Sequence, residues 1–534
     1  MGITNLLRIL AQITFFLPLG IVVTTSLLAG LLGRKDPILS ERILSAITFV
    51  SSFLLLAVSI WMLFTEKQDA SFDFLWVSFH VDALSIFMIL LINIVAFAAS
   101  WNSLAYLDAT PSLLEKPWWQ KKIGFHILIN LFHFTMLLVP LANNLVVVWI
   151  AIELTTVGSA ILIVYEGRKS SWEATWKYLI ITSTGIVLAL LGTIFLASHE
   201  TDAPILKLAN TPNQLLDWTF LMNNSTLLDP KLVWFAFLFA LVGYGTKAGL
   251  APLHTWLPDG HGEAPAPISA LLSGVLLKAS FYVILRFYIL TNAVLGSTHP
   301  DWTSYALLIA GLASLFVATP FILKENFFKR VLAYHSLEHM GIIAFGFGIG
   351  GPIAIAGALL HMLNHAITKA LMFLAYGNIS RNYDKAEIPI AGALRTMPWS
   401  GGLLTLGGLA LVGTPPFNIF MSELIILWGA LSRFIPNQSP TQPNYPMWIA
   451  GVAIAIFIIS TTLIFYGLVN HLKKLVLGKA EKEIVREHFS WTAIVPLIFL
   501  FALMLTLGVW IFPKLASLVH ESVNIVLNTQ GVNP

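Results

Sequence analysis

The stretch Val242-Gly-Tyr-Gly-Thr-Lys247-Ala-Gly-Leu-Ala-Pro252 decides the fold. It lies in an apolar run near residues 232–255 that is long enough to cross a membrane. Three glycines and a proline around one lysine predict an interrupted helix, because both residue types free backbone groups from the helical pattern. The stretch from Gly413 to Glu423, Gly-Thr-Pro-Pro-Phe-Asn-Ile-Phe-Met-Ser-Glu, repeats this arrangement around a glutamate. Discontinuous membrane helices of this kind line transport sites.

The composition extends this interpretation to the whole chain. Of its 534 residues, 57% are hydrophobic and only 11% are charged, against about 25% charged in an average soluble domain. This excludes a soluble enzyme, and a net charge of +3 gives no basic footprint for nucleic acid. The absence of cysteine excludes disulfides, thiolate catalysis and iron–sulfur ligation. We therefore expect an all-α polytopic membrane protein.

A search for runs of about 20 apolar residues predicts about fourteen transmembrane helices. They lie near residues 9–32, 43–64, 81–106, 123–141, 144–165, 172–197, 232–255, 267–290, 302–323, 327–349, 353–378, 399–432, 447–471 and 491–513. The longest polar connection, about 198–230, is expected to be a loop. The seventh and twelfth runs are the two expected to be discontinuous.

The basic residues predict the orientation. The odd-numbered connections hold 19 of the 30 lysines and arginines, and the even-numbered ones hold 4. Basic residues gather on the cytoplasmic side, so the odd connections are expected to be cytoplasmic. Both termini are then expected to lie outside.

The two interrupted runs lie five spans apart, which places them in opposite orientations. We therefore expect two inverted five-helix repeats, formed by the fourth to eighth and the ninth to thirteenth helices. The expected organisation is an N-terminal unit of three helices at 1–122, a first repeat at 123–290, an inverted second repeat at 291–472, and a segment 473–534 that holds a cytoplasmic loop, the last helix and an outer C-terminus.

Several charges fall inside the apolar runs, where a charge is costly and usually marks an ion or proton route. They include Glu153, Lys177, Lys247, Lys278 and Glu423. Glu153 and Lys177 lie on neighbouring spans, so we expect an ion pair that controls the protonation of Lys247. The alternative for Lys177 is a side chain that reaches the headgroups from a helix end.

Histidines are expected to form the middle of the route. His361, His365 and Lys369 recur at four-residue spacing and share one helix face, and His335 and His339 do the same on the preceding helix. Imidazole takes up a proton on one nitrogen and releases one from the other. A hydrogen-bonded structural role and a metal site remain alternatives. We expect no metal, because no cysteine, well-placed carboxylate or HExxH motif completes a ligand set.

Two further residues have expected roles near the membrane surfaces. His254 opens a rigid turn at the cytoplasmic end of the seventh span and is expected to load protons, whereas Arg286 is expected to be an anchor near the outer end. No motif for a redox cofactor is present, so we expect no cofactor and no redox catalysis by this chain alone. It is expected to act beside a partner, as a subunit of an oxidoreductase or a transporter.

The segment from Lys247 to Lys278, which contains Leu-His254-Thr-Trp-Leu-Pro-Asp-Gly-His-Gly-Glu-Ala-Pro, resembles a known family. It is similar to the antiporter-like proton-translocating subunits of respiratory complex I, membrane-bound nickel–iron hydrogenases and multisubunit Na⁺/H⁺ antiporters. The stretches Glu173-Ala-Thr-Trp-Lys177 and Gly413-Thr-Pro-Pro-Phe look most like component F of hydrogenase-4. The resemblance covers nearly the whole chain.

This resemblance implies a role for each matching residue. Glu153 resembles the glutamate that gates the lysine at Lys247, and Lys278 resembles the bridging lysine. Glu423 resembles the terminal residue of the route, which is lysine in some members and glutamate in others. His335, His361 and His365 fall where relay residues are expected.

The expected function is that of a proton-conducting subunit in a bacterial inner membrane. The route is expected to begin near His254, pass Lys247, Lys278 and the histidines, and leave by Glu423. The expected partners are the other subunits of a hydrogenase-4 or formate-hydrogenlyase-like complex. An inorganic-carbon uptake system with a zinc carbonic-anhydrase-like protein and a complex I or Na⁺/H⁺ antiporter assembly are the alternatives.

Overall fold

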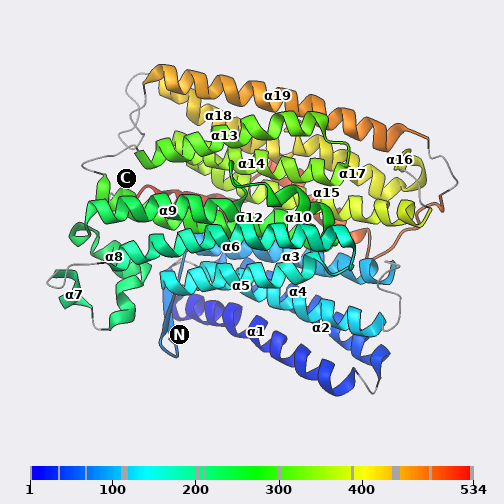
Figure 1. Cartoon of the computed structure of the whole chain (residues 1–534), viewed down its shortest axis with the longest axis horizontal. Helices are drawn as coiled ribbons and strands as arrows, with labels where there is room; N and C mark the ends of the chain where they lie inside the picture. Colours follow the sequence, from blue (N-terminus) through cyan, green and yellow to red (C-terminus); the bar gives the residue numbers. More distant parts are fainter. Residues whose placement is uncertain are drawn as a thin grey trace.

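The computed structural model describes residues 3–33, 36–65, 69–109, 118–198, 204–209, 211–296, 302–386, 390–435, 446–479 and 484–528. Within these ranges the chain is a bundle of helices with one small β-hairpin (Figure 1). Five of the loop residues that entered the orientation argument lie outside the described ranges: Arg34, Lys35, Lys67, Lys116 and Lys482.

All fourteen predicted runs are largely helical. The helices of the first half are α1 (Ile3–Leu32), α2 (Pro37–Met62), α3 (Ala83–Ala109), α4 (Trp118–Leu141), α5 (Leu145–Ile163), α6 (Lys169–Ala197), α9 (Pro230–Ala248), α11 (Ala266–Leu271) and α12 (Leu277–Leu295). Those of the second half are α13 (Trp302–Lys324), α14 (Phe328–Ile349), α15 (Gly351–Ala386), α17 (Pro398–Leu411), α18 (Asn418–Leu431), α19 (Met447–Leu477), α20 (Val495–Val509) and α21 (Pro513–Val526).

By length and apolarity alone, eleven helices of the described residues can cross a membrane, and the bent pair α20–α21 makes a twelfth. Three of the fourteen predicted runs are therefore not among the eleven. The run at 491–513 contains α20 of the bent pair, and the run at 399–432 is divided into the short helices α17 and α18. The run at 327–349 is α14, a continuous helix that is rich in polar residues.

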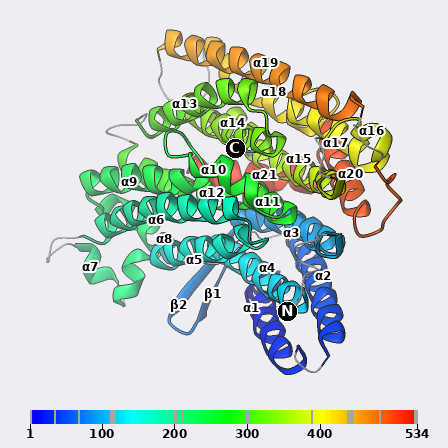
Figure 2. The same ribbon diagram turned by 45° about the vertical axis from the view of Figure 1, so that its right-hand side comes forward.

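The hairpin is the main departure from the all-helical prediction. Strands β1 (Asp69–Phe74) and β2 (Val77–Asp82) pair antiparallel between α2 and α3. Their aromatic side chains pack on Phe15 of α1, with ring centroids 4.8 Å apart for Phe15 and Phe79. The hairpin lies at the end of the bundle that also holds α8 (Trp218–Asn223) and the short α7 (Pro204–Leu208) (Figures 1 and 2).

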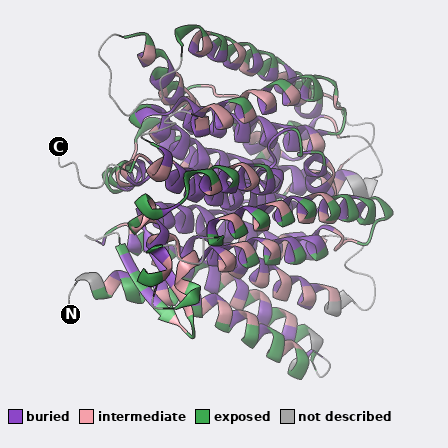
Figure 3. Cartoon of the chain, turned by 60° about the vertical axis from the view of Figure 1, so that its left-hand side comes forward, coloured by how far each residue is buried: buried purple, intermediate pink, exposed green. Residues whose placement is uncertain are grey.

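Burial separates the inner helices from the outer ones. The apolar stretches of α3, α11–α12 and α15 are buried throughout, whereas those of α1, α2, α6 and α19 are less than half buried. Figure 3 shows exposed residues along the outer helices around a buried centre. Polar groups on the inner helices are therefore shielded from lipid, which is where a membrane protein can keep them.

Both predicted interruptions are present. Helix α9 ends at Ala248, and Gly249 follows with a left-handed φ of 75°, before the short helix α10 (Trp256–Glu263). Between α17 and α18, Gly413 has a φ of 68°. Residues without a side chain adopt this conformation readily, which explains a glycine at each break. The predicted run at 232–255 therefore extends past the end of its helix.

After the last predicted run at 491–513 only an outer C-terminus was expected, but the described residues there form α21. This helix turns by 72° from α20 and packs its apolar side on α3 and α15. The connection at 198–230, expected to be a loop, contains α7, α8 and the short 3-10 segments Pro212–Leu216 and Ser225–Leu227. The remaining short elements are α16 (Ala393–Thr396) and Ser432–Phe434.

Candidate functional site

Lys247 is fully buried in the last turn of α9, two residues before Gly249. Its Nζ donates a 2.7 Å hydrogen bond to the carbonyl of Ile152 and a short one to the hydroxyl of Thr156. The Thr156 hydroxyl in turn lies 3.3 Å from Oε2 of Glu153. One threonine on α5 therefore joins the buried ammonium to the carboxylate, a link that the sequence analysis missed.

The expected Glu153–Lys177 ion pair does not form. Lys177 is about half exposed and pairs with Glu173 at 2.7 Å and with Asp259 of α10 at 3.2 Å. Glu153 instead accepts a 3.1 Å hydrogen bond from Ser183 of α6. The physical reason is position: Lys177 is two turns into α6, close enough to the surface to meet the exposed Glu173 and the partly buried Asp259.

Lys278 is buried in the middle of the molecule, where α11 passes into α12 through a π-helical turn at Leu272–Leu276. Its Nζ donates a 2.6 Å hydrogen bond to the carbonyl of Ser273 within that turn. The hydroxyl of Ser273 lies 2.7 Å from that of Ser336 on α14. A π-helical turn leaves carbonyl groups outside the regular pattern, and functional sites often use such groups.

The histidines of α14 and α15 face one another, as their spacing predicted. Nδ1 of His339 lies 2.9 Å from Nε2 of His361, and the ring of His339 stacks on that of His365 with centroids 4.5 Å apart. His335 is bonded at 2.7 Å to Glu338, one turn along α14. Lys369 donates to the carbonyl of Leu332, so it also joins α15 to α14.

Glu423 lies on α18 beside the last histidine. Nδ1 of His361 is 3.0 Å from the hydroxyl of Ser422, the residue before Glu423. Glu423 also lines a cavity of about 300 Å³ between α18 and α19, together with Gly413. The carboxylate therefore stands between the histidines and an opening on this flank of the bundle.

The expectation that no well-placed carboxylate completes a ligand set with the histidines is wrong. His335, Glu338 and His339 form one group whose ligand atoms lie within 4.8 Å of one another, and His339, His361 and Glu423 form a second. Both groups have the donor types that zinc accepts. The expected absence of a metal is not tested by this geometry.

His254 lies in the break that follows α9, mostly buried, and its Nδ1 is 3.2 Å from the carbonyl of Pro252. His261 of α10, which the sequence analysis did not include in the route, is fully buried beside Phe373 of α15. Neither of its ring nitrogens has a hydrogen-bond partner among the described residues.

We call the following residues the polar row: Glu153, Lys247, Lys278, His335, His339, His361, His365, Lys369 and Glu423. The lysines and histidines of the row are buried, and Glu153 and Glu423 are half-buried. Amines, imidazoles and carboxylates inside a membrane protein are groups that exchange protons.

A membrane bundle with two discontinuous helices and a buried row of ionisable groups belongs to the class of polytopic membrane transport subunits. The chain matches the family model for the NADH:quinone oxidoreductase/Mrp antiporter transmembrane region over residues 142–437, more than half its length. The chain belongs to this family. This confirms the resemblance to antiporter-like subunits seen in the sequence.

Individual relatives support the same family assignment. The chain is 38% identical over 399 residues to the hydrogenase-4 component F homolog of Methylacidiphilum infernorum, which covers 74% of this chain and 80% of that protein. Its fold is similar to a chain of the archaeal membrane-bound sulfane sulfur reductase, with a TM-score of 0.78, 21% identity and 97% of both chains covered. A chain of the Mrp complex from Dietzia has a TM-score of 0.77 at 17% identity, covering 97% of this chain and 99% of that one.

Proposed function

We propose that this antiporter-like subunit conducts protons through the membrane along the polar row. The observation that carries the proposal is the contact of the buried histidines His339 and His361 with one another and with Glu423 of α18, in an interior that also holds three buried lysines. Each group costs free energy in the membrane interior, and such groups persist where a proton route needs them. Protons enter the route near His254, in the break after α9, and leave it by way of Glu423.

The contacts also support a gate at the start of the row. A proton bound by Lys247 is shared with the hydroxyl of Thr156, whose other contact is the carboxylate of Glu153. Movement of that carboxylate changes the charge next to the lysine and thus its tendency to release a proton. Lys177 takes no part in this gate and instead acts with Asp259 at the cytoplasmic mouth.

We further propose that the chain works within a larger complex of the hydrogenase-4 type in a bacterial inner membrane. The support is the 38% identity to a component F homolog over three quarters of the chain. The other partners named from the sequence, an inorganic-carbon uptake protein or a complex I or Na⁺/H⁺ antiporter assembly, remain predictions. Purification of the chain with its bound subunits from the native membrane distinguishes among them.

The experiment compares Lys247→Met and Glu423→Gln with a control, Lys231→Met, which removes an exposed lysine at the other end of α9. Proton flux is measured in vesicles that hold the chain with its native partners. We expect loss of flux in the first two variants and wild-type flux in the control. Wild-type flux in Lys247→Met and Glu423→Gln, with normal assembly, would contradict the proposed function.

A further inference from the structure

A second group of buried charges lies outside the polar row, where the hairpin meets α12. The guanidinium of Arg286 donates two hydrogen bonds to the carboxylate of Asp82, at 2.6 and 2.7 Å. Asp82 is 5% exposed and Arg286 is 6% exposed. The sequence predicted an anchor at Arg286, and a bidentate pair of this kind fulfils that role. The pair is also surrounded by hydroxyl and imidazole groups, which an anchor does not need.

The hydroxyl of Tyr282 is joined to the pair. It accepts hydrogen bonds from Nε and Nη2 of Arg286, at 2.9 and 2.7 Å, and lies 3.1 Å from the hydroxyl of Ser85 on α3. Ser85 also lies 3.0 Å from the guanidinium, and its backbone amide donates to Asp82. Hydroxyls both accept and donate hydrogen bonds, and Tyr282 lines a small cavity together with His80, so its hydroxyl is able to pass a proton toward His80.

The same face of α12 leads back to the polar row. Lys278, Tyr282 and Arg286 follow one another at four-residue spacing, which places their side chains on one face of the helix, about one turn apart. All three are buried. This face therefore runs from the central lysine of the polar row to the buried pair at the hairpin end of the bundle.

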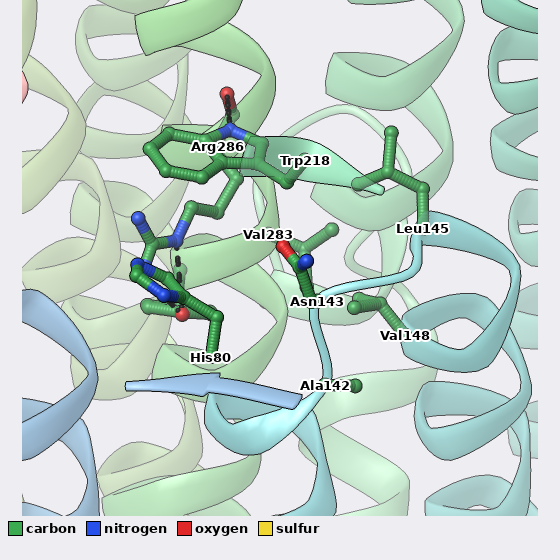
Figure 4. Close-up of a pocket in the computed structure, with 9 residues that line it drawn as sticks. His80, Ala142, Asn143, Leu145, Val148, Trp218, Val283 and Arg286 are labelled. Carbon is green, nitrogen blue, oxygen red and sulfur yellow. Dashed lines mark hydrogen bonds between the residues drawn. The ribbon is translucent and has the colours of Figure 1, made fainter. Parts of the chain in front are cut away.

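His80 of β2 separates the buried pair from the surface. Its Nε2 lies 3.9 Å from Oδ2 of Asp82, and its Nδ1 is 3.0 Å from the Ser71 hydroxyl and 3.7 Å from the exposed carboxylate of Asp69. Its ring stacks on that of Trp218, and the Arg286 guanidinium lies 4.3 Å from the centre of the Trp218 ring. Figure 4 shows His80, Arg286 and Trp218 around one cavity.

Two cavities meet at His80. The inner one, beside Arg286 and Asn143, has a volume of about 10 Å³, which is room for a single water molecule. The outer one has a volume of about 340 Å³ and is lined by His80, Asp82, Thr219 and Asn223. We call this outer cavity the hairpin hollow. A side chain that lines both cavities is placed to pass a proton between them.

The surroundings of His80 favour release of a proton from its imidazole. Burial lowers the pKa of the His80 imidazole, and Arg286 lowers it further, whereas Asp82 and Asp69 oppose this shift; the net pKa lies below its usual value. The imidazole is therefore neutral near neutral pH. A proton that arrives from the buried side is passed on readily.

We propose that the face of α12 from Lys278 to Arg286, together with Asp82 and His80, is a second proton port that connects the polar row to the hairpin hollow. The inference rests on the proposed proton conduction. A proton delivered to the Tyr282 hydroxyl displaces that hydroxyl's own proton across the water-sized inner cavity onto His80, which also lines that cavity. His80 releases it to water in the hollow, while Asp82 stays ionised beside Arg286. One proton arrives for each one released, and Arg286 positions the carboxylate.

The chain has no cysteine, so a single introduced thiol can be labelled without background. Asn223→Cys places the thiol in the hairpin hollow, and the matched control Thr226→Cys places it on the exposed surface three residues away. The complex is reconstituted in vesicles and treated with a membrane-impermeant, positively charged methanethiosulfonate on the hairpin side. We expect labelling to lower the proton flux in Asn223→Cys to the part that leaves by way of Glu423, and to leave the flux in Thr226→Cys unchanged.

Two substitutions test the relay itself. His80→Gln is expected to lower the flux to the level of labelled Asn223→Cys, because loss of a positioned proton-transfer group slows its own step roughly 100-fold, while the exposed His520→Gln retains wild-type flux. Tyr282→Phe keeps the ring beside Arg286 but removes the hydroxyl. It is expected to lower the proton flux. Its thermal unfolding midpoint is expected to match that of the His520→Gln complex.

The outcomes separate this proposal from the one on which it rests. An unmodified complex without any proton flux contradicts the proposed function. A complex that conducts protons, but whose flux is unaffected both by labelling at Asn223→Cys and by His80→Gln, overturns the second port alone. Loss of flux in Thr226→Cys on labelling also overturns it, because the effect then does not depend on the hollow.

Discussion

Thr156 shows at the scale of one residue how the membrane interior holds a charge. Its hydroxyl accepts from Lys247 and contacts Glu153, while the carbonyl of Ile152 accepts a second hydrogen bond from the lysine. A buried ammonium without such partners would be strongly destabilising. The threonine thereby makes the charge of the lysine sensitive to the position of the glutamate.

Replacement of Thr156 tests this link. Thr156→Val keeps the shape but removes the hydroxyl, and is expected to lower proton flux about tenfold, which corresponds to roughly 1.4 kcal/mol for a buried donor left unpaired. Thr156→Ser should retain the flux. The control is Thr184→Val, at an exposed threonine of α6 whose hydroxyl bonds only to its own helix. Equal flux in Thr156→Val and wild type would show that the hydroxyl is not needed.

Gly413 makes a second prediction at this scale. An added Cβ there would collide with the carboxylate of Glu423, and the φ of 68° disfavours a side chain as well. Gly413→Ala is expected to destabilise the protein by about 1–3 kcal/mol and to lower proton flux by displacing Glu423. Gly402→Ala, where nothing lies within 4 Å of the added Cβ, serves as the control. Thermal unfolding and flux are measured together, and wild-type values for both in Gly413→Ala would refute the expected clash.

At the scale of elements, the hairpin is fastened to α12 by the Asp82–Arg286 pair. Burial alone would raise the pKa of the Asp82 carboxyl, but the guanidinium of Arg286 outweighs burial and holds it below its usual value. The pair therefore stabilises the folded state whenever the carboxyl is ionised. Removal of one partner of a buried pair costs about 3–5 kcal/mol.

The lowered pKa of the Asp82 carboxyl sets how the stability of the folded state depends on pH. Because the folded pKa is depressed, the contribution of Asp82 is complete above the unfolded value of about 3.9 and is lost as the pH falls through the folded pKa. The unfolding midpoint of Asp82→Asn is therefore expected to lie well below that of the wild type at pH 7 and to approach it below about pH 4. Asp73→Asn, on the exposed side of the same hairpin, should match the wild type at both pH values. A difference for Asp82→Asn that grows on acidification would contradict the ion pair.

The sequence was sufficient for the helices, their interruptions and most of the polar row, because each signal is local. A lysine among apolar residues, or a glycine and two prolines before Glu423, can be recognised without knowledge of distant contacts. The hairpin was missed because β1 is short and depends on packing against Phe15. Thr156 and Ser422 were missed because hydroxyls are common on membrane helices, and only tertiary packing shows which of them lies beside a charge.

The same reason explains the wrong Glu153–Lys177 pair. Adjacent spans make many pairings possible, and the sequence does not show that Asp259, more than 80 residues away in the chain, lies nearer to the lysine. The inverted relation of residues 123–290 and 291–472 stays a prediction. The matching breaks after α9 and α17 are consistent with it.

At the scale of the whole molecule, the polar row crosses a bundle whose outer helices are apolar and partly exposed. Its central groups are nitrogen bases, whereas sodium prefers oxygen ligands. We expect proton flux at fixed pH to be the same in sodium and in potassium media of equal ionic strength, which vesicle assays with each salt will measure. An increase in flux that saturates with sodium would indicate a cation site in place of a proton route.

Lys278 provides the most direct test, because both the polar row and the second proton port depend on it. The measurement is the proton flux, driven by an imposed membrane potential, of vesicles that hold the complex with Lys278→Met in place of the wild-type chain. Proton conduction along the row predicts that the flux is lost while the complex remains assembled and its unfolding midpoint is not lowered. Wild-type flux in Lys278→Met would contradict the route proposed for this protein.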